Sequence, residues 1–189
     1  MTALEMRRMI YAALYLALAM VLPFVTGQIP EIGSMLLPMH IPILLCGFMC
    51  GWKYGLVVGF IAPLLRSVTF GMPPMIPTAV AMAFELAVYG GMSGRLRQLL
   101  PGKTCFVYVT LLAAMVAGRI AWGTVRLVLM GLAVSEFSWK LFIIGAVTEA
   151  VPGIILQLVI IPVMVIAMEK AGLSLNAKEK EHDGNSNGN

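Results

Sequence analysis

Three long stretches without a charged residue constrain the fold more than any other feature of the chain. Residues 9–30, 32–52 and 150–168 contain no Asp, Glu, Lys or Arg. A bilayer core of about 30 Å is crossed by roughly 20 apolar residues in a helix. Only 12% of the 189 residues are charged, whereas a soluble domain carries about 25%. The sequence therefore predicts an all-α integral membrane protein.

The apolar runs and the breaks between them predict a bundle of six transmembrane helices in one domain, residues 1–170. We place the helices at 8–26, 36–51, 53–67, 78–96, 104–134 and 139–168. The segment 69–77 is rich in Gly, Met and Pro, which predicts a loop or a broken segment. Residues 171–189 are polar and have little apolar surface to bury, so they are predicted to be a disordered tail.

The distribution of basic residues predicts the orientation. Most of them fall on the side that holds both termini: Arg7, Arg8, Lys53, Arg95, Arg97, Lys103, Lys170, Lys178 and Lys180. Lys140, Arg66 and Arg126 fall on the other side. Because loops rich in Lys and Arg stay in the cytoplasm, both termini are predicted to be cytoplasmic. The positive charges flank helices beside the lipid bilayer, so the net charge of +4 does not indicate a nucleic-acid partner.

Five ionisable residues lie within or near the predicted helices and are the main candidates for binding. They are Arg66, Glu85, Arg119, Arg126 and Glu149. A charge at the bilayer centre costs at least about 2.5–3.5 kcal/mol, and such residues face a bundle interior or a cavity. The sequence therefore predicts that these side chains line a polar site.

Helical spacing groups these residues into stripes. Arg119 and Arg126 are seven residues apart and share a helix face with Trp122. Glu85 and Tyr89 share a face of another helix, and a third helix carries Glu149, with Gln157 off to one side of its face. Together with His40, these residues are the predicted substrate-binding set.

The charges among these residues suggest the ligand class. Three arginines and two glutamates would form two ion pairs and leave one arginine over. A ligand carboxylate can complete the set, because guanidinium binds carboxylate with two hydrogen bonds. The alternative is that Arg66 or Arg126 reaches the membrane interface and needs no partner.

Motifs of enzymes and metal sites are absent from the sequence. Gly102-Lys103-Thr104 resembles the end of a phosphate-binding loop, but Arg97 stands where the first glycine is required. Cys46 and Cys50 have no histidine cluster beside them, so they are interpreted as packing residues. We expect no enzymatic activity, no metal and no cofactor.

Small residues recur at helix-packing intervals. Gly47, Gly51, Gly55 and Gly59 are spaced four apart, which allows close approach of another helix, although a turn near Trp52 interrupts the run. Ala13 and Ala17 form a similar pair in the first helix. Such pairs serve either internal packing or docking to a partner membrane protein.

Taken together, the sequence resembles the substrate-binding (S) components of energy-coupling factor (ECF) transporters over residues 5–170. The resemblance is carried by the size, the six helices, the segment Leu37-Pro-Met-His-Ile-Pro and the two glycine pairs that follow it. In that family, an Ala-x3-Ala motif in the first helix contacts a shared transmembrane coupling subunit, and Ala13 and Ala17 match it.

The resemblance implies a subunit of a prokaryotic plasma-membrane importer that captures a water-soluble vitamin. A coupling subunit and two ATPases would drive its release to the cytoplasm. The surplus arginine favours a carboxylate, and the resemblance to the pantothenate-type branch of the family makes pantothenate the first expectation; riboflavin, folate, a pyridoxine-like compound or a queuosine precursor are alternatives. The rival class is a non-transport scaffold such as a rod-shape-determining protein, which has similar helices but needs no polar ligand pocket.

Overall fold

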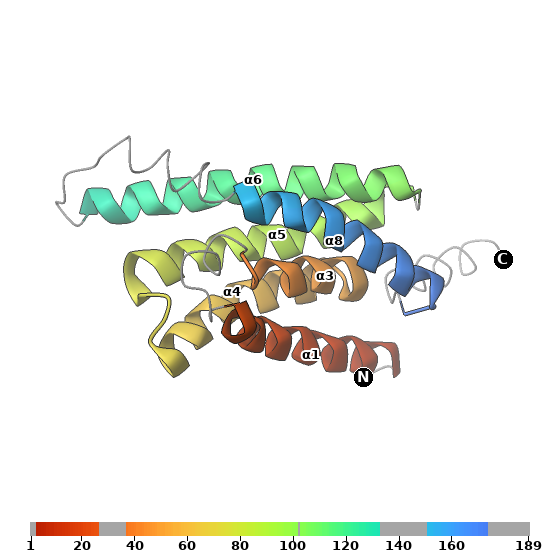
Figure 1. Ribbon diagram of the computed structural model, residues 1–189, viewed down its shortest axis with the longest axis horizontal. Coiled ribbons are helices and arrows are strands. Elements are labelled where there is room, and N and C mark those ends of the chain that lie inside the picture. The colour runs from red at the N-terminus through yellow and green to blue at the C-terminus, as the bar shows by residue number, and fades with distance from the viewer. Residues whose placement is uncertain (1–2, 27–36, 102, 133–150, 174–189) are drawn as a thin grey trace.

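The computed structural model describes residues 3–26, 37–101, 103–132 and 151–173, and within these ranges the chain is helical without a strand. The elements, which run mainly along the long axis of the molecule in Figure 1, are α1 (Ala3–Thr26), α3 (His40–Cys50), α4 (Trp52–Phe70), the π-helical turn η1 (Met75–Ala79), α5 (Val80–Leu99), α6 (Thr104–Leu132) and α8 (Val151–Lys170). The all-α fold predicted from the sequence is confirmed.

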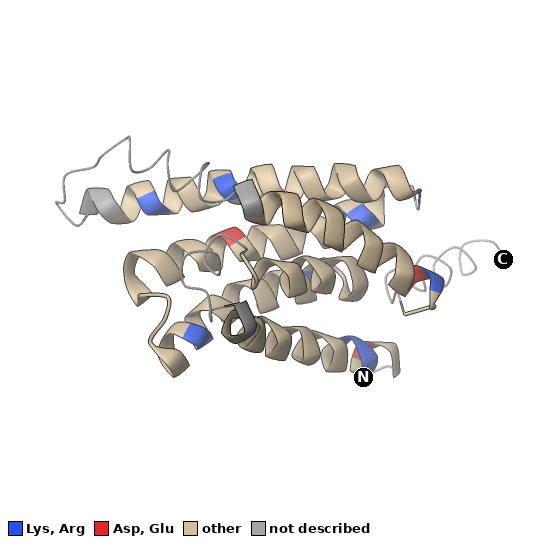
Figure 2. Cartoon of the chain, viewed as in Figure 1, with Lys and Arg blue, Asp and Glu red and all other residues tan. Residues whose placement is uncertain are grey.

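Among the described residues, five helices are long and apolar enough to cross a membrane. They comprise Ala3–Phe24, Trp52–Phe70, Met75–Leu99, Thr104–Leu129 and Gly153–Lys170. Figure 2 shows that most of the helical length carries no charged residue. These helices make the chain a multi-pass membrane protein, whereas the predicted count of six crossings and the cytoplasmic termini stay predictions.

Helix α3 differs from the other helices because it is short and fully buried. Its 11 residues are all buried, and at 1.5 Å per residue it extends only about 16 Å, half the thickness of a bilayer core. A helix that is apolar on every side is stable only when protein surrounds it. It packs against α1, α4, α5 and α8 and forms the centre of the bundle.

Glycines bring α4 and α5 into direct backbone contact. A Cβ atom on Gly55 or on Gly90 would clash with the carbonyl oxygen of the other, and one on Gly59 would clash with that of Leu86. A Cβ on Gly55 would also lie 2.8 Å from the Cα of Gly47 in α3. The predicted glycine groove is confirmed, and the helix that fills it is α5 of the same chain.

Gly51 breaks the glycine run, as the sequence indicated, because it forms the turn between α3 and α4. Its φ of 101° lies in the region that only glycine adopts easily. A Cβ on Gly94 would clash with the backbone nitrogen of Trp52, so this turn sits flush against α5. One residue therefore joins two antiparallel helices.

Several predicted boundaries were wrong. Helix α4 continues to Phe70 and includes Thr69, which was predicted to lie in a loop; the Thr69 hydroxyl donates to the Leu65 carbonyl at 2.8 Å, and Gly71 with φ 70° ends the helix. Helix α3 begins at His40, so Pro38 lies in the turn before it rather than within it. The predicted helical residues 133–134 and 139–150, and the tail from 174 on, lie outside the described residues.

An ion pair that the sequence did not predict joins α5 to α8. The Arg97 guanidinium donates to both carboxylate oxygens of Glu169, with Nη2 at 2.6 Å and 2.7 Å and Nε at 3.0 Å. Nearby, the Tyr15 hydroxyl of α1 donates to the sulfur of Met168 at 3.6 Å. Figure 1 shows that the start of α1 and the end of α8 lie at one end of the molecule, here called the N-terminal end.

Two adjacent glycines of α5 provide a matched test of the helix contact. Gly90→Ala should destabilise the protein by about 1–3 kcal/mol, because the new methyl group meets the Gly55 backbone. Gly91→Ala should be nearly neutral, since its Cβ would come no closer than 3.5 Å to Leu56. Chemical denaturation in detergent micelles measures both. Equal stability of the two variants would contradict the close packing of α4 on α5.

Candidate functional site

A buried acid lies at the centre of the site. Glu85 of α5 is 1% exposed, and its Oε1 lies 3.3 Å from Nε of Arg119 in α6 and 3.7 Å from Nε2 of His40 in α3. The three residues come from three helices. A buried carboxylate is stable only when it is paired, and the guanidinium of Arg119 supplies that partner.

The depth of this acid in the bundle follows from the helix bounds. Glu85 lies 14 residues before Leu99, and Arg119 lies 15 residues after Thr104, so both are about 20 Å from the N-terminal end. The buried residue Gln157 of α8 lies 13 residues before Lys170, at a similar depth. The site is therefore well inside the span, toward the end of the bundle opposite the N-terminus.

Aromatic rings flank the charged groups. Tyr89 lies one helical turn from Glu85, and its ring centre is 5.3 Å from that of His40 at an interplanar angle of 64°. Tyr89 fits against α6 because residue 118 is glycine; a Cβ there would clash with the ring. The stripe predicted for Glu85 and Tyr89 is confirmed, whereas the role of Gly118 was missed. The sequence feature that could have predicted this role is the position of Gly118 directly before an arginine within a predicted membrane helix.

On α6, Trp122 lies between two arginines. The Cζ atoms of Arg119 and Arg126 are 5.8 Å and 4.9 Å from the centre of its ring. Cations over an indole face are favoured by about 0.5–2 kcal/mol, depending on how far they are desolvated. The shared face predicted for these three residues is confirmed, and it continues the site beyond Glu85. We call His40, Glu85, Tyr89, Arg119 and Trp122 the Glu85 cluster.

Many polar atoms of the site make no hydrogen bond within the described part of the chain. They are Glu85 Oε1, Arg119 Nε and Nη2, both ring nitrogens of His40 and both amide atoms of Gln157. The Glu85–Arg119 contact is thus an ion pair by distance, but its angles are not those of a hydrogen bond. Each unsatisfied buried group costs about 1–3 kcal/mol, and native proteins rarely retain several. This arrangement can bind a small molecule that offers both donors and acceptors.

The structure does not bring Arg66 to the Glu85 cluster. Its Nη1 donates to the carbonyl of Met20 at 2.7 Å, and its Cζ lies 4.7 Å and 5.5 Å from the ring centres of Phe24 and Phe70. Arg66 therefore joins α4 to α1. Glu149, also predicted for the site, lies outside the described residues.

The Glu85–Arg119 pair can be tested by a double-mutant cycle. Glu85→Gln and Arg119→Gln should each destabilise by about 3–5 kcal/mol, because each strands a buried charge. The double variant should lose about 0.5–3 kcal/mol less than the sum, as measured by denaturation in micelles. A control cycle of Glu85→Gln with Arg66→Gln should be additive. Equal coupling in both cycles would contradict a specific pair.

Comparison with known proteins supplies the family. Residues 7–165 match the family model described as ECF transporter, substrate-specific component. No curated protein and no solved structure matches the chain significantly. The matched range begins in α1 and ends in α8, so it includes every residue of the Glu85 cluster. The family consists of binding components of transporters that work with ECF transmembrane and ATPase modules, and is not an enzyme family. The chain belongs to the substrate-specific components of ECF transporters.

Proposed function

We propose that this protein is the high-affinity binding subunit through which a prokaryotic ECF importer captures a water-soluble vitamin that bears a carboxylate. The observation that carries the proposal is Arg119, whose Nε and Nη2 are buried and donate a hydrogen bond to no described residue. A guanidinium in such a position favours a planar, two-oxygen partner. Membership of the family supports the role of a binding subunit, and the buried arginine supports a ligand that bears a carboxylate.

The charges of the described site support an anionic ligand. Arg119 lies against one acid, Glu85, and Arg126 lies over the ring of Trp122, so two arginines accompany one acid. Arg66 is occupied by the Met20 carbonyl and two phenyl rings. A carboxylate between the two arginines would balance this excess. His40, Gln157 and Glu85 then offer donors and acceptors for hydroxyl or amide groups.

Pantothenate fits this set of groups best, because it combines a carboxylate with an amide and hydroxyl groups. Riboflavin, folate, a pyridoxine-like compound and a queuosine precursor remain alternatives. A rod-shape-determining scaffold would have no use for so many unsatisfied buried atoms, so the site favours a binder over that class.

The surface of α1 supports a docking role for the alanine pair. Ala13 and Ala17 are exposed, whereas Ala12, Tyr15 and Ala19 of the same helix are buried in the core. The outward face can therefore accept the helix of a coupling subunit without disturbing the fold. We place both termini in the cytoplasm, where two ATPases would drive release of the vitamin.

The ligand class is tested first by mass spectrometry of small molecules released from the purified protein. We expect a carboxylate-bearing vitamin. Arg119→Gln should weaken binding of radiolabelled pantothenate about ten- to hundredfold, the equivalent of one charge-assisted hydrogen bond of about 1.5–3 kcal/mol. The alcohol analogue of pantothenate, which lacks the charge, should bind similarly to both proteins.

Arg66→Gln is the matched control for this experiment. It removes the same charge from α4 but should leave ligand affinity unchanged, because its contacts are with α1. Tight binding of neutral vitamins together with no binding of acidic ones would contradict the carboxylate hypothesis.

The docking role is tested by enlarging the alanine pair. Ala13→Leu with Ala17→Leu should abolish co-purification of the ECF coupling subunit while ligand binding is retained, since both positions face outward. Ala167→Leu, an exposed position on α8, should have no effect. Normal assembly of the double variant would show that the coupling subunit docks elsewhere.

A further inference from the structure

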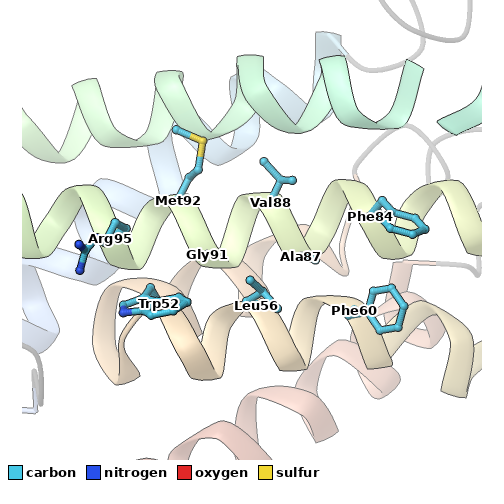
Figure 3. A pocket seen from close by; sticks show the side chains of 9 residues that line it. All are labelled: Trp52, Leu56, Phe60, Phe84, Ala87, Val88, Gly91, Met92 and Arg95. Carbon is cyan, nitrogen blue, oxygen red and sulfur yellow. The ribbon is translucent and has the colours of Figure 1, made fainter. Parts of the chain in front are cut away.

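A groove of about 580 Å³ lies on the outside of the bundle between α4 and α5 (Figure 3). All of its lining residues are apolar except one arginine; they are Trp52, Leu56, Phe60, Phe84, Ala87, Val88, Gly91, Met92 and Arg95. Leu56, Phe60 and Phe84 are 41%, 38% and 44% exposed on helices that are long and apolar enough to span a membrane. The groove therefore faces lipid, and it is separate from the Glu85 cluster.

Small residues of α5 create the groove. Ala87 and Gly91 form its floor, and a Cβ on Gly91 would meet only Leu56, at 3.5 Å. Phe60 and Phe84 close one end with rings 5.6 Å apart in an edge-to-face arrangement. Arg95 and Trp52 stand at the other end (Figure 3). The groove thus has an apolar body, a closed aromatic end and a cationic end.

The length and position of the groove match one leaflet. Phe84 and Arg95 are eleven residues apart on α5, or about 16 Å, close to half of the roughly 30 Å hydrocarbon core. Arg95 is exposed and lies near the N-terminal end of the bundle. Among the described residues, it has no hydrogen-bond or ion-pair partner. Beside it, Lys53 lies 5.8 Å from the ring centre of Trp52. The two cations and the tryptophan at this end of the groove are side chains typical of the level of the lipid headgroups.

We propose that this groove is a binding site for one anionic phospholipid of the leaflet on the N-terminal side. An acyl chain lies along Ala87 and Gly91, and Arg95 binds the phosphate, as arginine does through paired N–H donors. Charge complementarity and leaflet length identify an amphipathic anion.

Native mass spectrometry of the purified full chain tests the proposal. The protein is equilibrated in detergent micelles with equal amounts of phosphatidylglycerol and phosphatidylcholine. We expect one tightly retained phosphatidylglycerol per chain. Arg95→Gln should reduce the preference for phosphatidylglycerol about fivefold, the factor for one basic residue at an anionic surface. Gly91→Leu should remove the retained lipid, because the larger side chain fills the floor.

Matched controls lie at the same end of the bundle on α8. Lys170→Gln removes an exposed cation, and Ala167→Leu enlarges an exposed small residue; neither lines the groove, so both should retain lipid as the wild type does. Arg95→Gln changes an exposed side chain, so the test does not depend on the folding of Gly91→Leu.

Three results would overturn the proposal. The first is equal retention of the two lipids by the wild type, and the second is an unchanged preference in Arg95→Gln. The third is loss of the coupling subunit, but not of lipid, in Gly91→Leu, which would assign the groove to a protein partner.

Discussion

The direct contact between the backbones of α4 and α5 is the constraint on which the rest of the structure depends. Gly55, Gly59 and Gly90 leave no room for a side chain between the two helices, so the rotation of α5 about its own axis is fixed. With that face flush against α4, Glu85 and Tyr89 are directed toward α3 and α6. The position of the charged site is thus a consequence of glycine packing.

The helices could be predicted from the sequence, because they depend on local features such as the length of uncharged segments and the spacing of side chains. Charge-free length predicts helices in lipid, and a period of 3.6 residues predicts that Arg119, Trp122 and Arg126 share a face. Both hold in the structure. The glycine spacing also predicted a close helix contact, although not which helix would fill it.

The sequence did not predict which residue each charged side chain would contact, because these contacts depend on the tertiary arrangement. Arg66 and Arg119 look alike in the sequence, yet one binds a carbonyl of α1 and the other lies against an acid of α5. Arg97 and Glu169 are 72 residues apart, so no spacing rule links them. Similarly, segment 36–51 was predicted as a short transmembrane helix, but the sequence did not show that the helix would be buried on every side by the protein around it.

The complete burial of α3 has a mechanical consequence. Its first residue, His40, lies beside Glu85 in the site, and its last, Cys50, is followed by Gly51 at the opposite end of the bundle. Close-packed protein interiors transmit strain, and α3 is packed by protein on all sides. The geometry therefore couples the imidazole of His40 to the α3–α4 turn over about 16 Å, from the Glu85 cluster to the N-terminal end of the bundle.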